Sequence, residues 1–126
     1  MRAIGRRARW QKISREASRQ CGRSDVPAIE VVTPLPTALH AVSKDAFRVI
    51  LWEGARGTSL TDVLPDTRPP EMAVAVGPEG GFSPTEVEVA RAAGFIPAGI
   101  GPRILRTETA ALAILAILQF RLGDLG

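Results

Sequence analysis

The sequence predicts an α/β protein with a mainly parallel sheet that is covered by helices on both faces. Short apolar segments of strand length alternate along the chain with segments of helical pattern. These apolar segments lack the strict polar alternation of a strand with one solvated face, so we expect both faces of the sheet to be buried. The 126 residues, of which 45% are hydrophobic and 23% charged, are enough for one domain with a real core.

The first expected element is an arginine-rich helix over about residues 7–22. Its apolar stripe of helical spacing consists of Trp10, Ile13, Ala17 and Cys21. Eight of the sixteen basic residues lie in the first 23 positions, against one acid, a pattern typical of a nucleic-acid contact. The candidate contact residues are Arg6, Arg7, Arg9, Arg15 and Arg19. The alternative is a solvated helix face in a protein that uses fourteen arginines and two lysines.

The middle of the chain supplies the next elements. We expect a strand at 27–32, a helix at 35–42, a strand at 47–52, one helical turn at 60–64 and a strand at 72–76. The helix is entered through Pro34 and Pro36, and glycines at 54 and 57 end the second strand.

The last third adds a helix, a strand and a second helix. Ser83 to Glu86 is a capping box with Pro84 at the first helical position, followed by a helix of about twelve residues. A strand at 95–100 is expected despite Pro97, and a final helix, Thr107–Leu122, opens with a threonine cap. This helix is apolar almost all round, so it is buried either against a second subunit or deep within its own domain.

A glycine-rich loop joins the strand at 72–76 to the capping box. Gly77, Gly80 and Gly81 lack Cβ atoms, so backbone N–H and C=O groups can approach a ligand closely. The alternative is a plain strand-to-helix turn.

A second loop of the same kind follows the strand at 95–100 and leads through residues 101–106 into the last helix. The carboxyl ends of parallel strands meet at one sheet edge, so the two loops could form opposite walls of one pocket. Neither matches a Walker or dinucleotide signature, and the carboxylate of Glu79 would repel a phosphate.

Three segments carry a family resemblance: the two loops, Gly77-Pro78-Glu79-Gly80-Gly81-Phe82-Ser83 and Gly101-Pro102-Arg103-Ile104-Leu105-Arg106-Thr107-Glu108-Thr109-Ala110, and the upstream segment Arg9-Trp10-Gln11-Lys12-Ile13. Together they resemble the ribosomal RNA small-subunit methyltransferase E family. The resemblance covers most of the chain. It implies a SPOUT-type fold with a C-terminal trefoil knot, S-adenosyl-L-methionine as cofactor, and N3 methylation of a uridine in 16S rRNA. It also implies the small ribosomal subunit as partner and a homodimer through the Thr107–Leu122 helix.

With this chemistry, a carboxylate suits a cationic sulfonium cofactor better than a lysine would. The expected cofactor-binding residues are Leu51, Gly77, Glu79, Gly80, Gly81, Ile100, Gly101, Ile104, Leu105 and Arg106. Arg106, with Glu79, is the catalytic candidate, because a fixed cation stabilises the negative charge that develops on the uracil ring. The alternative for Arg106 is a salt bridge to Glu108 or Glu79 that shapes the loop.

We expect a single domain over residues 1–126 that lacks the family's N-terminal PUA-like domain and first strand-helix unit. Such a chain is a fragment, a truncated gene product or an incorrectly started reading frame.

Other residues carry smaller predictions. Cys21 and Trp10 are expected in the core, and His40 is expected to bind no ligand; no metal site is expected. One cysteine permits no internal disulfide, which favours the cytoplasm, and no apolar run is long enough to span a membrane.

Two rival functions remain open. One is a non-catalytic RNA-binding or ribosome-assembly module that uses the basic N-terminal helix. The other is an enzyme that binds a phosphate ligand at the Gly80-Gly81 turn.

Overall fold

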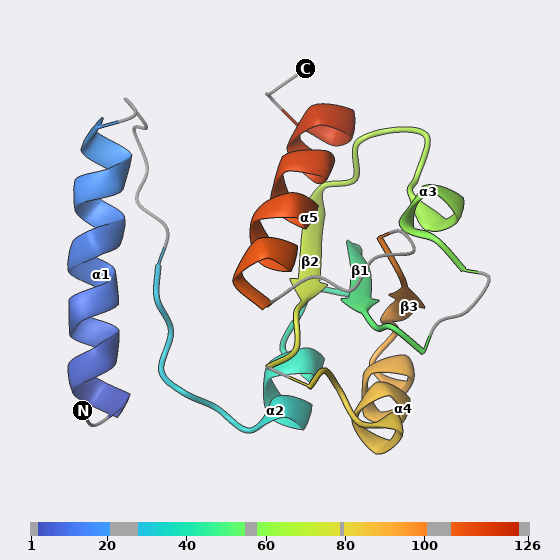
Figure 1. Ribbon diagram of the computed structural model, residues 1–126, viewed down its shortest axis with the longest axis horizontal. Helices are drawn as coiled ribbons and strands as arrows, with labels where there is room; N and C mark the ends of the chain where they lie inside the picture. The colour runs from blue at the N-terminus through green and yellow to red at the C-terminus, as the bar shows by residue number, and fades with distance from the viewer. Residues whose placement is uncertain (1–2, 21–27, 55–57, 79, 101–106, 124–126) are drawn as a thin grey trace. The chain divides into compact units, whose positions relative to one another are not determined.

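The computed structural model describes residues 3–20, 28–54, 58–78, 80–100 and 107–123 (Figure 1). Within the helices, the side chains of residues 3–7, 10 and 107 lie outside this description. The chain divides into two compact units, residues 1–34 and residues 35–126.

The first unit contains the helix α1 (Ala3–Gln20), which begins four residues earlier than expected. The Oε1 atom of Gln11 accepts a hydrogen bond of 2.7 Å from the backbone N–H of Ile29, which ties the following segment to the helix. Ile13, on the expected apolar stripe, is 51% exposed, whereas Ser18 is buried. The stripe is therefore not a packed seam within this unit, and Cys21 and the Trp10 side chain lie outside the described residues.

The strand expected at 27–32 is wrong for the described residues 28–32, which form no regular secondary structure. Val31 and Val32 are 60% and 68% exposed, and the three-stranded sheet does not include them. An apolar, β-branched segment becomes a strand only when a neighbouring strand takes its backbone hydrogen bonds.

The second unit is built on a parallel sheet of three strands, β1 (Ala46–Leu51), β2 (Glu71–Ala75) and β3 (Ile96–Ala98). Their order is β2-β1-β3, so β1 is central and the chain crosses from one edge to the other after β2. Val49 is paired with Val74 on one side and with Ile96 on the other. The predicted parallel α/β class is confirmed.

The strand β3 is shorter than expected. An isolated bridge between Ser59 and Gly99 continues the pairing for one residue beyond Ala98. Pro97 has no N–H to donate, and this is tolerated because β3 is an edge strand.

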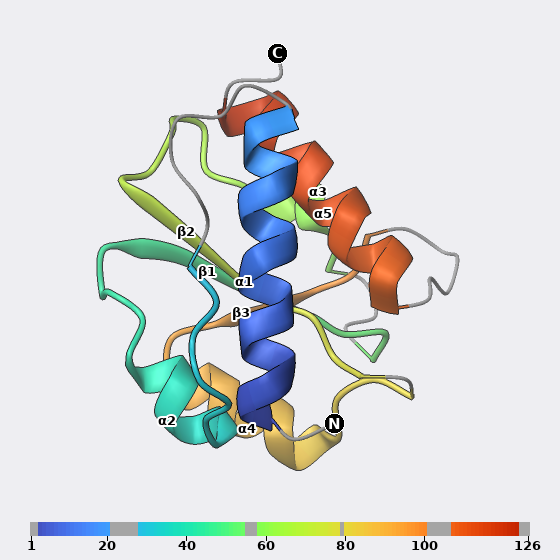
Figure 2. The same cartoon turned by 90° about the vertical axis from the view of Figure 1, so that its left-hand side faces the viewer.

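Helices cover both faces of the sheet, as predicted. Neighbouring strand residues point to opposite faces, and Ile50 and Val49 accordingly belong to different apolar clusters. One cluster includes residues of α2 (Leu35–His40) and α4 (Pro84–Ala92), and both views show these two helices side by side (Figure 1, Figure 2). The other includes residues of α3 (Leu60–Val63) and α5 (Thr107–Leu122).

The helix α5 is buried on one side only. Ile114, Leu118 and Leu122 are 1%, 3% and 7% exposed, and they share a face because they are four residues apart. On the remaining surface Leu112, Leu115 and Phe120 are 72%, 55% and 65% exposed. Of the two alternatives, deep burial of this helix within its own domain is therefore wrong.

A candidate cofactor site at the carboxyl edge of the sheet

The strand order indicates where a ligand would bind. From the central strand β1 the chain passes through α3 to β2 on one side, and then through α4 to β3 on the other. In open α/β sheets the crevice for a ligand forms at the carboxyl ends of the strands where the order reverses, here the ends of β1 and β3. These ends carry Leu51 and Ile100, which are two of the predicted cofactor-binding residues.

Leu51 and Ile100 lie on the same side of the sheet. Leu51 is paired with Ala98, two residues before Ile100. Both side chains are partly buried, and both pack against the apolar cluster that includes Leu60 and Ile114. The structure therefore brings these two predicted residues together, at the place where an apolar slot for a planar ring would need its walls.

The predicted glycine loop has the expected backbone geometry. Gly80 and Gly81 have φ values of +86° and +76°, a region that residues with a side chain rarely adopt. The N–H of Gly81 donates a 2.8 Å hydrogen bond to the carbonyl oxygen of Pro78, which closes the turn. A Cβ atom at either glycine would meet nothing within 4 Å, so backbone conformation and not space requires glycine here.

Gly77 is favoured for a different reason, the close approach of a neighbouring ring. A Cβ atom there would lie 3.1 Å from the ring of Phe82, which is itself buried in the cluster with α4. Phe82 thus packs the far end of the loop back onto its beginning.

The capping box that follows is confirmed in detail. The Ser83 Oγ accepts from the N–H of Glu86 at 3.2 Å, and the Glu86 carboxylate accepts from the N–H of Ser83 at 2.9 Å. Pro84 occupies the first helical turn. The loop is therefore held at one end by the strand β2 and at the other by the capped start of α4.

Five of the predicted site residues lie outside the described residues. They are Glu79, Gly101, Ile104, Leu105 and Arg106. Their cofactor-binding and catalytic roles stay predictions.

The basic helix α1 presents its charges to solvent. Arg9, Lys12, Arg15 and Arg19 are all exposed. The side chains of Arg6 and Arg7 lie outside the described part of the chain.

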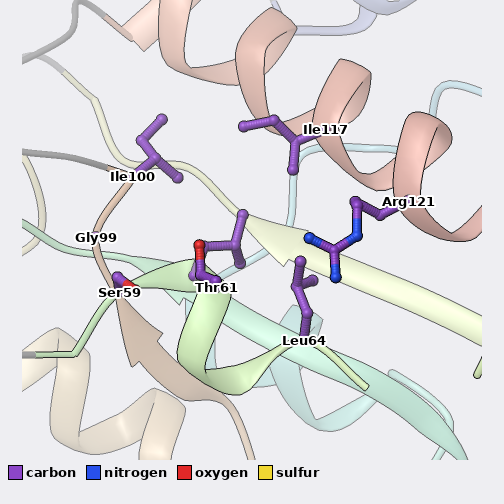
Figure 3. A pocket seen from close by; sticks show the side chains of 8 residues that line it. Ser59, Thr61, Leu64, Gly99, Ile100, Ile117 and Arg121 are labelled. Carbon is purple, nitrogen blue, oxygen red and sulfur yellow. The ribbon is translucent and has the colours of Figure 1, made fainter. Parts of the chain in front are cut away.

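A pocket of about 240 Å³ lies between α3, α5 and the end of β3 (Figure 3). Its apolar lining is Leu60, Leu64, Ile100 and Ile117, and its polar lining is Ser59, Thr61 and Arg121, with Gly99 between them. Ile100 belongs both to this pocket and to the predicted cofactor site. The remaining pocket residues were not predicted from the sequence. Two signals could have pointed to them: the capping-box spacing of Ser59 and Asp62, and a basic residue, Arg121, within a largely apolar helix.

The family model for the RNA methyltransferase domain matches residues 2–119. This chain belongs to the RNA methyltransferase domain family. Among curated relatives, the chain is 34% identical over 116 residues to the ribosomal RNA small subunit methyltransferase E of Buchnera aphidicola from Schizaphis graminum, covering 92% of the chain and 46% of the relative. It is 31% identical over 127 residues to the Bacillus subtilis protein of the same name, covering 95% and 49%. The chain thus spans about half the length of the curated relatives that it matches.

Solved structures of similar proteins extend this finding to the fold. A ribosomal RNA small subunit methyltransferase E from Neisseria gonorrhoeae, bound to S-adenosyl methionine, matches 100% of the chain and 52% of its own length, with a TM-score of 0.89 and 37% identity. A Legionella pneumophila protein solved with bound cofactor SAM matches 98% of the chain and 49% of its own length, with a TM-score of 0.87 and 36% identity. Among the described residues, no helix of this RNA methyltransferase domain is long and apolar enough to cross a membrane.

Proposed function

We propose that this RNA methyltransferase domain binds S-adenosyl-L-methionine and transfers its methyl group to ribosomal RNA. The strongest support is that the whole chain matches, at a TM-score of 0.89, a protein crystallised with that cofactor. Leu51 and Ile100 lie at the ends of β1 and β3, where the strand order predicts a ligand, and the glycine loop follows β2 at the same carboxyl edge of the sheet.

The chemistry of the loop fits a cationic cofactor. Two consecutive glycines with positive φ leave their backbone groups uncovered by side chains, and Leu51 and Ile100 offer apolar walls for an adenine ring. The carboxylate of Glu79 would attract a sulfonium and repel a phosphate, which disfavours the rival enzyme with a phosphate ligand at the Gly80-Gly81 turn.

We propose N3 of a uridine in 16S rRNA as the atom that is methylated. This step requires loss of the N3 proton, and the negative charge that then develops on the ring needs a fixed cation. Arg106 is the candidate cation, and a C-terminal trefoil knot through residues 101–106 stays a prediction of the family resemblance.

The decisive experiment is calorimetry with S-adenosylhomocysteine. The wild-type chain is expected to bind, and Gly80→Val is expected to weaken binding at least tenfold because valine strains a backbone at φ +86°. Ala92→Val, at an exposed position near the end of α4, is the matched control and should bind like the wild type. Absence of binding by the wild-type chain would rule out the cofactor assignment. Transfer of a labelled methyl group to small-subunit rRNA, mapped to the base, tests the uridine assignment.

We also propose a homodimer through α5. Leu112, Leu115 and Phe120 form an exposed apolar surface on a helix whose other side is already packed. Sedimentation of the wild-type chain should give a dimer that Leu112→Asp converts to a monomer, whereas Thr109→Asp, an exposed change of the same charge one turn away, should have a smaller effect. A wild-type chain that sediments as a monomer would contradict the proposal.

The second candidate function is a non-catalytic RNA-binding or assembly module, which the exposed basic residues of α1 support. Neutralising Arg9, Arg15 and Arg19 should then abolish salt-sensitive RNA binding, while Gly80→Val leaves it intact. Methyl transfer by the wild-type chain would exclude this candidate. The cytoplasmic location stays a prediction.

A further inference from the structure

Among the described residues that line it, the pocket between α3 and α5 combines an apolar floor with one cation, Arg121. Figure 3 shows Arg121 reaching from α5 toward the side of the pocket that α3 forms, with Leu64 and Ile117 nearby. The guanidinium of Arg121 has no hydrogen-bond or ion-pair partner among the described residues. None of the described residues that line the pocket carries a carboxylate.

Asp62, the acid that follows Thr61 in the sequence, is already engaged. The Oδ2 atom of Asp62 accepts hydrogen bonds from the N–H and from the hydroxyl of Ser59, each at 3.1 Å. This uses the hydroxyl proton of Ser59, so the donors left to a ligand are the Arg121 guanidinium and the Thr61 hydroxyl, which has no partner among the described residues. A cation and a hydroxyl beside an apolar surface match an oxyanion that carries an apolar group.

We propose that this pocket binds a backbone phosphate of the RNA substrate, with Arg121 and Thr61 as donors and the attached nucleoside on the apolar floor. The proposal rests on the proposed RNA methyltransferase function. The pocket's volume of about 240 Å³ exceeds what a bare phosphate needs. Ile100 lines the pocket and is also one of the predicted cofactor-binding residues. The phosphate would therefore belong to a nucleotide close to the one that is methylated.

The centre of the proposed dimer surface lies away from the pocket. Leu112 and Arg121 are nine positions apart on α5, which at 3.6 residues per turn is about two and a half turns, so they lie on opposite sides of the helix. A dimer centred on Leu112 leaves the pocket accessible.

The experiment measures binding of small-subunit rRNA over a series of salt concentrations. Arg121→Gln is expected to lower RNA affinity about tenfold at low salt and to reduce the slope of log K against log salt by about 1, because one phosphate contact is lost. Arg121→Lys should restore the salt slope with part of the affinity, since lysine keeps the charge without the bidentate geometry. Arg91→Gln, on the exposed side of α4 and paired with Glu88, is the matched control and should leave both quantities unchanged.

Three results would overturn the proposal. One is an RNA affinity and salt slope that Arg121→Gln does not change. Another is a loss of S-adenosylhomocysteine affinity with RNA binding intact, which would assign Arg121 to the cofactor's carboxylate. The third is a change in the sedimentation of Arg121→Gln, which would assign the pocket to a contact between copies.

Thr61→Val provides a second variant that keeps the helix α5 unchanged, and it should lower RNA affinity less than Arg121→Gln without altering the salt slope. Failure of the proposed function would be recognised separately. A wild-type chain that binds RNA but no S-adenosylhomocysteine would contradict the methyltransferase function, and the salt slope of its RNA binding would still test the phosphate contact.

Discussion

The helices α4 and α5 cover opposite faces of the same sheet, but only α4 combines capped ends with an exposed side that is largely polar. A capping box closes the start of α4, and at its end the N–H groups of Gly94 and Phe95 donate to the carbonyls of Arg91 and Ala90, each at 2.9 Å. This is a Schellman motif, in which glycine adopts φ +88°. The exposed side of α4 is largely polar, with an ion pair between Glu88 and Arg91.

The helix α5 has the opposite character. Its buried side is as well packed as that of α4, but its remaining surface exposes large apolar residues and borders the pocket with Arg121. A helix with capped ends and a polar exposed side contributes stability, whereas a large exposed apolar surface is typical of contact with other molecules. The α4 side therefore supports the glycine loop, and the surfaces that we propose for binding lie on the α5 side.

The largest expected effect is the difference in unfolding free energy between a substitution on the buried side of α5 and one on its exposed side. Ile114→Ala should lower the free energy of unfolding by about 2–5 kcal/mol, since it opens a cavity at a side chain that is 1% exposed. Leu112→Ala, at 72% exposure, should cost under about 0.5 kcal/mol in the monomer. Urea denaturation over a range of protein concentrations measures both. If Leu112→Ala matched Ile114→Ala at the lowest concentration, the exposed side of α5 would have to be packed within one chain.

The next effect compares two glycines with nearly equal φ angles, Gly94 at +88° and Gly80 at +86°. Gly94→Ala should cost about 2–4 kcal/mol, because alanine strains the positive φ and its Cβ would lie 2.7 Å from Cζ of Arg48. That arginine donates a 3.0 Å hydrogen bond to the carbonyl of Ala93 and would be displaced. Gly80→Ala, with open space around its Cβ, should cost only the strain of about 1–2 kcal/mol.

Denaturation curves of the two glycine variants give the difference directly. Equal costs would mean that Arg48 moves aside without loss and does not help to hold the end of α4.

A smaller effect tests the capped start of α4. Ser83→Ala should lower the free energy of unfolding by about 1 kcal/mol, because the N–H of Glu86 loses its acceptor. Ser83→Asp, which keeps an acceptor oxygen and places a negative charge at the helix N-terminus, should retain most of the stability. Thermal denaturation followed by circular dichroism distinguishes the two variants, and an equal loss in both would contradict a capping role.

The smallest effect is expected at the surface of α4. The Glu88 and Arg91 side chains are 71% and 51% exposed, with 3.2 Å between Oε1 and Nε. Glu88→Ala should change the free energy of unfolding by no more than about 0.5 kcal/mol, and less at high salt. A larger, salt-independent loss would indicate that α4 is held by more than its caps and its buried side.

The local features were predictable because they depend on neighbouring residues. The capping box at Ser83, the positive φ at Gly80 and Gly81, and the limits of α5 all follow from short-range steric and hydrogen-bonding preferences. The helix α4 is nine residues long rather than about twelve, because the chain turns at Gly94 into a Schellman motif. A strand at 28–32 was predicted from the same kind of local preference and is wrong, because pairing depends on residues far away in sequence.

The sequence by itself thus determined the α/β class, the glycine loop with its capped helix, and the family, because these are properties of local pattern and motif order. Only the tertiary structure decided the strand order β2-β1-β3, and with it the meeting of Leu51 and Ile100 at the carboxyl edge. It also decided which side of α5 is buried and which residues share a pocket with Arg121. These depend on which segments pack together across long separations in sequence, and an all-round apolar helix or an isolated arginine carries no local signal for its neighbours.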